Sequence, residues 1–155
     1  MKVSSIKGLS VDHVDEDQGR ASVSDLILDV DERRVLALQL SWSSTPTQYA
    51  VSVDDVQSVG SDGVSLNPLA TILPLPDLPQ YLSKPSVNRM LGERAVSEDG
   101  TVLGDLSDID VDTGTWTIRS YSVVRDLARA FENGPEEIPA DRVATGAESL
   151  MVKSG

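Results

Sequence analysis

Asp25-Leu-Ile-Leu-Asp29 and Asp108-Ile-Asp-Val-Asp112 are two copies of one pattern, in which acidic residues flank a strongly β-forming segment. Each copy follows a polar turn that contains Gly and precedes a further run of β-forming residues. The pattern therefore predicts that this chain contains two related β modules. It indicates much about architecture and little about chemistry.

A second pair of segments supports the duplication. Val51-Ser-Val-Asp-Asp-Val56 and Ile138-Pro-Ala-Asp-Arg-Val143 place apolar residues at the same spacing, and each leads to a Gly. We therefore divide the chain into a first repeat over residues 1–66 and a second repeat over residues 87–155. Residues 67–86 connect them.

Composition restricts the classes of partner. The chain of 155 residues has a net charge of −12, which repels phosphate backbones, so we expect no nucleic-acid partner and favour a protein with a basic surface. The chain has no Cys, which excludes disulfides, thiolate metal sites and Cys nucleophiles. It has no apolar signal segment and no run of ~18 apolar residues, so we expect a cytoplasmic protein that does not span a membrane. Docking on a membrane complex stays compatible with this pattern.

Periodicity predicts mostly strands. In the first repeat we expect strands over residues 3–14, 23–30, 34–42, 49–53 and 64–66, with a helical turn over 54–58. In the second repeat we expect strands over residues 91–97, 102–111 and 116–121. The second repeat alone also has a helical pattern, over residues 122–133, with Ser122 as a candidate N-cap and Asn133-Gly134-Pro135 as a stop signal.

The connecting segment, residues 67–86, carries five of the eight prolines. Proline fixes φ and lacks a backbone N–H, so the segment is predicted to be neither helix nor interior strand. It also contains several Leu residues and Tyr81, which a free linker would not need. We interpret it as an extended strap packed along both modules. A proline-rich docking segment is the alternative.

With the repeat laid out, the chain resembles the PRC-barrel family. The resembling residues of the second copy are Asp99-Gly100, Gly104, Leu106, Asp108, Asp112-Thr-Gly114 and Trp116. The first copy departs from the pattern: Ala21 stands in place of Gly104, and a longer hairpin, Asp31–Arg34, replaces the tight turn. The resemblance implies a mainly β fold of two small PRC-like β-barrels in tandem, joined by the proline-rich strap, with one α-helix inserted in the second. It implies no reaction, because members of the family act mostly as assembly, adaptor or stabilising modules.

Asp25 and Asp108 begin apolar strands at equivalent positions. We expect each carboxylate to cap backbone N–H groups of the adjoining turn. A paired-carboxylate active site is the sharper alternative. The predicted turn and cap residues are Gly19, Asp25, Asp29, Gly100, Gly104, Asp108, Asp112 and Gly114.

The acidic residues Asp108, Asp110 and Asp112 are weak candidates for a metal site. They resemble a calcium loop, but Thr113 and Arg119 stand where an EF-hand needs Gly and Glu. Alternation with apolar residues favours a half-buried strand instead. Calcium binding stays open, and no cofactor is predicted.

Catalytic motifs are missing. His13 is the only histidine, and the chain has neither a G-x-S-x-G motif nor a phosphate-binding glycine loop. We therefore expect a non-enzymatic adaptor or assembly protein that binds a protein partner. The candidate partner-binding residues are Tyr81, Trp116, Val123, Leu127 and Phe131. The alternative is a protein that binds a small molecule or a metal ion, using a cleft between the barrels and the acidic strand 108–112. The sequence also leaves open whether the chain forms homo-oligomers through exposed strand edges.

Overall fold

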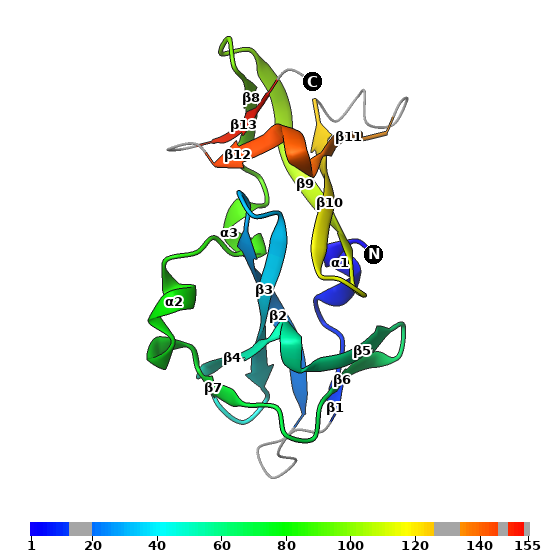
Figure 1. Cartoon of the computed structure of the whole chain (residues 1–155), viewed down its shortest axis with the longest axis vertical. Helices are drawn as coiled ribbons and strands as arrows, with labels where there is room; N and C mark the ends of the chain where they lie inside the picture. The colour runs from blue at the N-terminus through cyan, green and yellow to red at the C-terminus, as the bar shows by residue number, and fades with distance from the viewer. Residues whose placement is uncertain (13–19, 126–133, 146–148, 154–155) are drawn as a thin grey trace.

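The computed structural model describes residues 1–12, 20–125, 134–145 and 149–153. Within these residues the protein is mainly β, as predicted, and its helices are short (Figure 1). The molecule is elongated. The residues before the strap lie mostly at one end, and those after it lie mostly at the other.

The first half is built around one long hairpin. Its elements are α1 (Val3–Ile6), β1 (Val11–Asp12), β2 (Ala21–Asp29), β3 (Arg34–Trp42), β4 (Gln48–Ser52), η2 (Val53–Asp55), β5 (Val56–Gly60) and β6 (Gly63–Leu66). The strap forms β7 (Ile72–Pro74), η3 (Leu75–Asp77) and α2 (Pro79–Leu82).

The second half repeats the order of the first. Its elements are α3 (Val87–Met90), β8 (Arg94–Ser97), β9 (Val102–Asp112), β10 (Thr117–Val124), β11 (Glu136–Pro139), η4 (Ala140–Arg142), β12 (Val143–Thr145) and β13 (Leu150–Val152). The pairings also repeat. β6 lies parallel to β1 as β13 lies parallel to β8, and the hairpins β2–β3 and β9–β10 are both antiparallel.

Glycines after α1 and α3 fix the alignment of the two halves. Gly8 and Gly92 both have φ of 90°, a conformation that favours glycine. The Gly8 N–H donates to the Val23 carbonyl at 2.7 Å, and the Gly92 N–H donates to the Leu106 carbonyl at 2.8 Å. Residues that follow these glycines therefore occupy equivalent places in the two halves.

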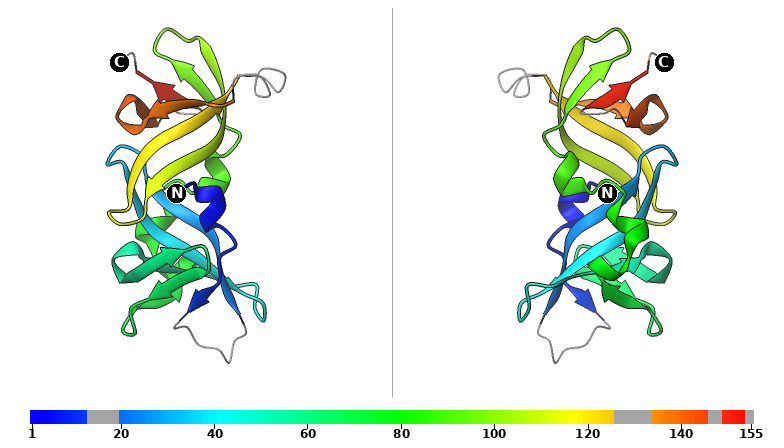
Figure 2. Two further views of the ribbon diagram at one scale, coloured as in Figure 1. Left: turned by 90° about the vertical axis from the view of Figure 1, so that its right-hand side faces the viewer. Right: turned by 90° about the vertical axis from the view of Figure 1, so that its left-hand side faces the viewer.

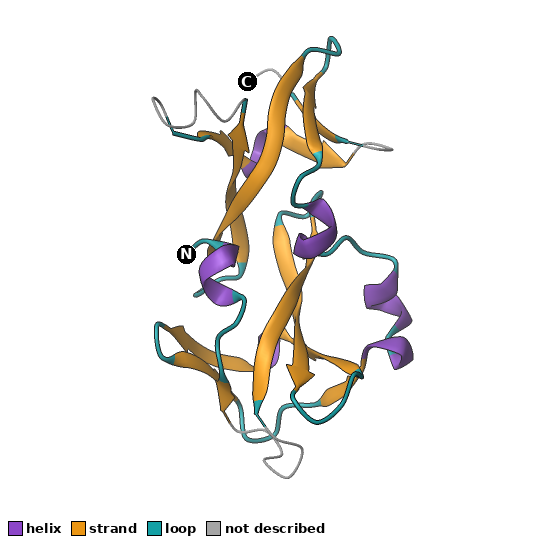
Figure 3. Ribbon diagram, turned by 180° about the vertical axis from the view of Figure 1, so that it is seen from behind, coloured by secondary structure: helices purple, strands orange, loops and turns teal. Residues whose placement is uncertain are grey.

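The segments that begin the halves are exchanged. We call residues 1–8 the first arm and residues 85–92 the second arm. The first arm packs on β9 of the second half, where the Val111 N–H donates to the Met1 carbonyl at 2.9 Å. The second arm packs on β2 of the first half, where the Leu28 N–H donates to the Pro85 carbonyl at 2.9 Å. Figure 3 shows α1 and α3 at mid-height, between the two ends.

The two long hairpins also meet at the middle of the molecule (Figure 2). The Val35 N–H donates to the Trp116 carbonyl and the Ile118 N–H donates to the Arg33 carbonyl, both at 2.8 Å. Arg33 and Trp116 have nearly the same positive φ, 57° and 58°. These reciprocal bonds join β3 to β10, so one ten-stranded sheet runs through both halves. The halves are thus related by an approximate two-fold axis at this junction.

One continuous apolar core fills both halves, and the arms contribute Val3, Ile6, Val87 and Met90 to it. A smaller cluster lies under the strap and consists of Ile27, Ala37 and Ala50 with Leu36, Leu75, Leu78 and Tyr81. The strap therefore packs on the first half through one of its faces.

The predicted strands over residues 3–14 and 91–97 are wrong at their starts. Each arm forms a helical turn, and only Val11–Asp12 and Arg94–Ser97 are extended. Val3, Ile6 and Val87 are fully buried, and the side chain of Met90 is 2% exposed. A spacing of three residues between buried side chains is typical of a helix.

The helix predicted over residues 122–133 is contradicted at its start. Ser122, Val123 and Val124 belong to β10, which lies between β9 and β11. Two consecutive β-branched residues suit this position better than a first helical turn. Residues 126–133, with Leu127 and Phe131, lie outside the described residues.

Two further expectations are corrected. The loop of the first hairpin is not longer than the loop of the second. The first loop lies between Asp29 and Arg34, the second lies between Asp112 and Thr117, and the two have the same number of residues. The strap does contain a short helix, α2, with Pro79 at its first turn, where a missing N–H costs nothing. β7 is an edge strand, as its proline requires.

Candidate functional site

The acidic strand 108–112 is part of β9. Ile109 and Val111 are fully buried, and Asp108, Asp110 and Asp112 alternate with them on the other face. Alternation of this kind is what a half-buried strand requires. The acidic residues therefore project from one side of the sheet.

Each of these carboxylates is engaged by the protein. Asp108 accepts hydrogen bonds from the Ser4 N–H at 3.3 Å and from the Ser4 hydroxyl. Asp110 accepts from the Met1 nitrogen at 3.0 Å. Asp112 caps the hairpin turn by accepting from the Gly114 N–H at 2.8 Å. Among the described residues, no group of three or more His, Cys, Asp or Glu is placed to hold a metal ion.

Asp25 is the counterpart of Asp108 and is almost completely buried. Its Oδ1 accepts from the Leu26 N–H at 2.8 Å and from the Asn88 N–H at 3.0 Å. Asp108 likewise accepts from the Ile109 N–H at 2.8 Å. Each aspartate thus binds its own strand and the arm of the other half. Both carboxylates hold the exchanged arms in place.

Asp29 lies at the end of β2 and caps the hairpin loop. A hydrogen bond from the Glu32 N–H at 3.0 Å holds the pKa of the Asp29 carboxyl below its usual range, and the Lys84 ammonium at 3.1 Å acts in the same direction. The bond to Lys84 ties the strap to the first hairpin.

Among the predicted turn glycines, Gly104 is the most constrained. Its φ is 145°, and a Cβ there would lie 2.4 Å from the Val124 carbonyl oxygen. Gly100 has φ of 89° in the β8–β9 turn, where hydrogen bonds from Ser97 and Thr101 lower the pKa of Asp99 to about 2. Gly19 lies outside the described residues.

The predicted partner-binding residues are mostly inward-facing. Val123 and Trp116 are buried, so neither presents a surface to a partner. Tyr81 is half-buried and packs on the small cluster under the strap. Leu127 and Phe131 lie outside the described residues.

Three leucines of the strap that the sequence did not single out have exposed side chains. Leu69 is 93% exposed, Leu82 is 52% exposed and Leu73 is 42% exposed. The other large apolar side chains exposed in the described residues are Met1, Val102 and Met151. Val102 and Met151 are both cross-strand partners of Val96, so these two lie close together on the second half. The strap thus holds three of the six large apolar side chains that are exposed in the described residues. Exposed apolar side chains that adjoin one another are typical of an interaction surface.

A Ser–Lys–Glu cluster lies where the first arm meets β10 and β11. Lys2 Nζ lies 2.9 Å from Ser122 Oγ and 2.6 Å from Glu137 Oε1. Burial opposes ionisation of Glu137, but hydrogen bonds from Lys2 and Ser122 outweigh it, so the pKa of this carboxyl is below its usual range. An ion-paired lysine is a poor general base, and Ser122 is only 1% exposed. The cluster is therefore suited to anchoring the arm and unsuited to attack on a substrate.

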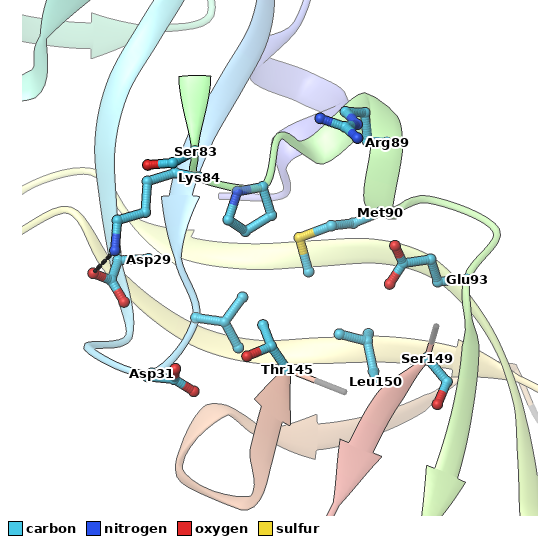
Figure 4. A pocket seen from close by; sticks show the side chains of 12 residues that line it. Asp29, Asp31, Ser83, Lys84, Arg89, Met90, Glu93, Thr145, Ser149 and Leu150 are labelled. Atoms are coloured by element: carbon cyan, nitrogen blue, oxygen red, sulfur yellow. Dashed lines mark hydrogen bonds and ion pairs between the residues drawn. The ribbon is translucent and has the colours of Figure 1, made fainter. Parts of the chain in front are cut away.

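A cavity of ≈ 420 Å³ lies between the halves, on the side of α3 (Figure 4). Its walls come from the first hairpin loop, the end of the strap, α3, the end of β12 and the start of β13. It contains the Lys84–Asp29 pair together with Arg89 and Glu93. It is separate from the acidic strand 108–112.

Comparisons with known proteins leave the family open. No protein-family model matches this sequence, and no curated protein matches it. Among the helices that the structure describes, none is long and apolar enough to cross a membrane.

Proposed function

We propose that this chain is a tandem PRC-barrel-like protein that acts as a cytoplasmic, non-enzymatic adaptor or assembly factor, and that it binds a protein partner through the exposed leucines of the strap. The exposure of Leu69, Leu73 and Leu82 is the observation that carries this proposal. Exposing large apolar side chains to water is unfavourable, and a partner that covers them gains about 25 cal/mol for each Å² of apolar surface buried.

Strand order supports the barrel part of the proposal. In the first half the order is β5-β6-β1-β2-β3-β4, with the bridge Ser10–Ser22 joining β1 to β2. In the second half it is β12-β13-β8-β9-β10-β11. In both halves the first and last strands of this order are consecutive in the chain and are joined by a 3₁₀ turn, η2 or η4. Such an order suits a sheet that curls round on itself into a small, partly open barrel.

The strap offers two kinds of contact. Its exposed leucines supply apolar anchors, and β7 is the last strand in the order of the large sheet, so a partner strand could add to its free edge. Pro74 lacks a backbone N–H, which limits pairing at that position and leaves side-chain contacts as the main source of affinity.

Charge indicates the partner's chemistry. The net charge of −12 attracts basic surfaces over long distances and increases their association rate. We therefore propose a partner with an apolar patch surrounded by Lys and Arg. Its binding is expected to slow at high salt concentration while the apolar contacts persist.

Affinity capture with the full chain tests the proposal. The wild-type protein, the double variant Leu73→Ser, Leu82→Ser and the control double variant Val102→Ser, Met151→Ser are immobilised and exposed to a lysate of the source organism. The control removes apolar side chains of similar exposure from the second half. Mass spectrometry should recover one stoichiometric protein with the wild type and the control but not with the strap variant. Equal recovery with the strap variant, or no stoichiometric protein with any of them, would contradict the proposal. Circular dichroism verifies that all three are folded.

A further inference from the structure

The two halves are related by an approximate two-fold axis. Each residue that lines the cavity between them can therefore be compared with the residue at the equivalent position of the other half. Because the two halves share one backbone arrangement, a side chain that the fold requires should have a similar counterpart at the equivalent place. Charged side chains present in one half only are instead candidates for a role beyond folding.

The hydrogen bonds of the arms define the equivalent places. The Val23 N–H donates to the Leu9 carbonyl, and the Leu106 N–H donates to the Glu93 carbonyl, so Glu93 corresponds to Leu9. The Ser5 N–H donates to the Lys2 carbonyl as the Arg89 N–H donates to the Ser86 carbonyl, so Arg89 corresponds to Ser5.

Three charged residues of the cavity therefore have no charged counterpart in the other half, and these are Asp31, Arg89 and Glu93. Arg89 and Glu93 stand at the positions that Ser5 and Leu9 occupy in the first half. Asp31, in the first hairpin loop, corresponds to Gly114 in the second. The shared backbone arrangement does not require these charges, because the equivalent positions of the other half hold Ser5, Leu9 and Gly114.

The charged side chains of the cavity also do not all form ion pairs with one another. Lys84 is paired with Asp29 at 3.1 Å, but the described residues provide no ion-pair partner within 4.0 Å for Arg89 or for Glu93. In Figure 4, Arg89, Met90 and Glu93 lie along one wall of the cavity, and Asp31 and Thr145 lie across from them. A free guanidinium and a free carboxylate thus face the same space.

The remaining lining is partly apolar. Val30, Met90 and Leu150 are each about 98% buried and form apolar parts of the wall. The cavity volume of ≈ 420 Å³ lies within the range of small-molecule sites. Most of the other lining side chains are polar or charged, so the apolar surface is one part of a largely polar cavity.

We propose that this cavity binds a small zwitterion of the amino-acid type, with its carboxylate on Arg89, its ammonium on Glu93 and an apolar side chain against Met90 and Leu150. A guanidinium binds a carboxylate through two parallel N–H bonds, which makes Arg89 the specific end of the site. Glu93 supplies the opposite charge for the ammonium. The site is independent of the exposed leucines of the strap, so either proposal can fail without the other.

Amide NMR of the full chain tests this site with L-leucine and the dipeptide leucyl-alanine as probes. Saturable shifts are expected at residues 89–93 and around Thr145 and Leu150. N-acetyl-leucine lacks the ammonium and leucinamide lacks the carboxylate, so each should bind about tenfold more weakly than leucine. Absence of saturable shifts at millimolar concentrations, or equal binding of the capped compounds, would overturn the proposal.

Matched variants identify the groups. Arg89→Gln and Glu93→Gln should each weaken binding by about tenfold, because each removes one charged hydrogen bond. Arg119→Gln and Glu98→Gln change exposed residues outside the cavity and should leave binding unchanged. Arg89 is exposed, so its variant is expected to fold, which melting temperature verifies. Unchanged binding in both cavity variants would contradict the site.

Discussion

The first half, residues 1–66, and the second half, residues 87–153, share their element order, their strand pairings and the exchange of their arms. They differ in the side chains that this common backbone carries. The strap with its exposed leucines packs on the first half, and only the second half has Arg89 and Glu93 at their positions. The element order, strand pairings and arm exchange that the halves share form the common fold. We therefore look for function where the two halves differ.

The largest effect is expected at Gly104. Substituting Ala would place a Cβ 2.4 Å from the Val124 carbonyl oxygen at a φ of 145°, so G104A should lose about 4 kcal/mol of stability or fail to fold. The counterpart Ala21 already has a Cβ in β2. A21G should therefore cost only about 1 kcal/mol, by weakening a strand. Urea unfolding of both variants measures the difference, and equal losses would show that the halves do not differ here.

The arm contacts should be unequal. D25A leaves the Leu26 and Asn88 N–H groups without an acceptor inside the protein, so it should cost about 2–4 kcal/mol. Asp108 is more exposed and water can replace it, so D108A should cost about 1 kcal/mol. Chemical denaturation compares the two. A larger loss in D108A would mean that the first arm, and not the second, dominates the junction.

Tyr121 differs from its counterpart Leu38 by a buried hydroxyl. The hydroxyl has no hydrogen-bond partner in the described structure, and burial raises the pKa of Tyr121. Y121F removes an unsatisfied polar group, so stability should stay the same or rise by up to about 1 kcal/mol. Thermal unfolding checks this prediction. A clear loss of stability would reveal a partner for the hydroxyl.

The smallest effect concerns Asp29, which has a lysine partner that its counterpart Asp112 lacks. Its pKa in the folded protein is below the unfolded value, so its contribution to stability is present above about pH 4 and is lost as the pH falls through the folded pKa. Lys84→Met should raise this pKa, but only in part, because the Glu32 N–H still donates. Carbon-13 NMR titration of the carboxyl in both proteins measures the shift. An unchanged pKa would show that Lys84 has no influence.

The sequence predicted the duplication because Asp25 and Asp108 mark the same strand in both copies, and the strand pattern around them is regular. It did not predict the arm helices. The apolar pattern around Val3 and Ile6 predicts a strand, but their spacing of three residues also fits a helical turn. In such a short apolar run, tertiary packing decides between helix and strand. The exchange of arms joins residues such as Ser4 and Asp108, which are far apart in the chain, and no local pattern encodes such a contact.

The candidate sites were harder to predict. Leu75 packs inward and Leu73 faces outward on the same strap, and a segment interrupted by proline has no period from which to tell them apart. Arg89 and Glu93 are ordinary surface charges in the sequence. Only comparison with Ser5 and Leu9 in the folded chain marks them as unusual.

The most direct test of the claim that function lies where the halves differ is hydrogen–deuterium exchange on the full chain, with and without the protein recovered by capture. We expect the partner to slow exchange in residues 69–82 and to leave exchange in the shared hairpins β2–β3 and β9–β10 unchanged. Slower exchange concentrated in the shared hairpins, with residues 69–82 unchanged, would contradict the claim.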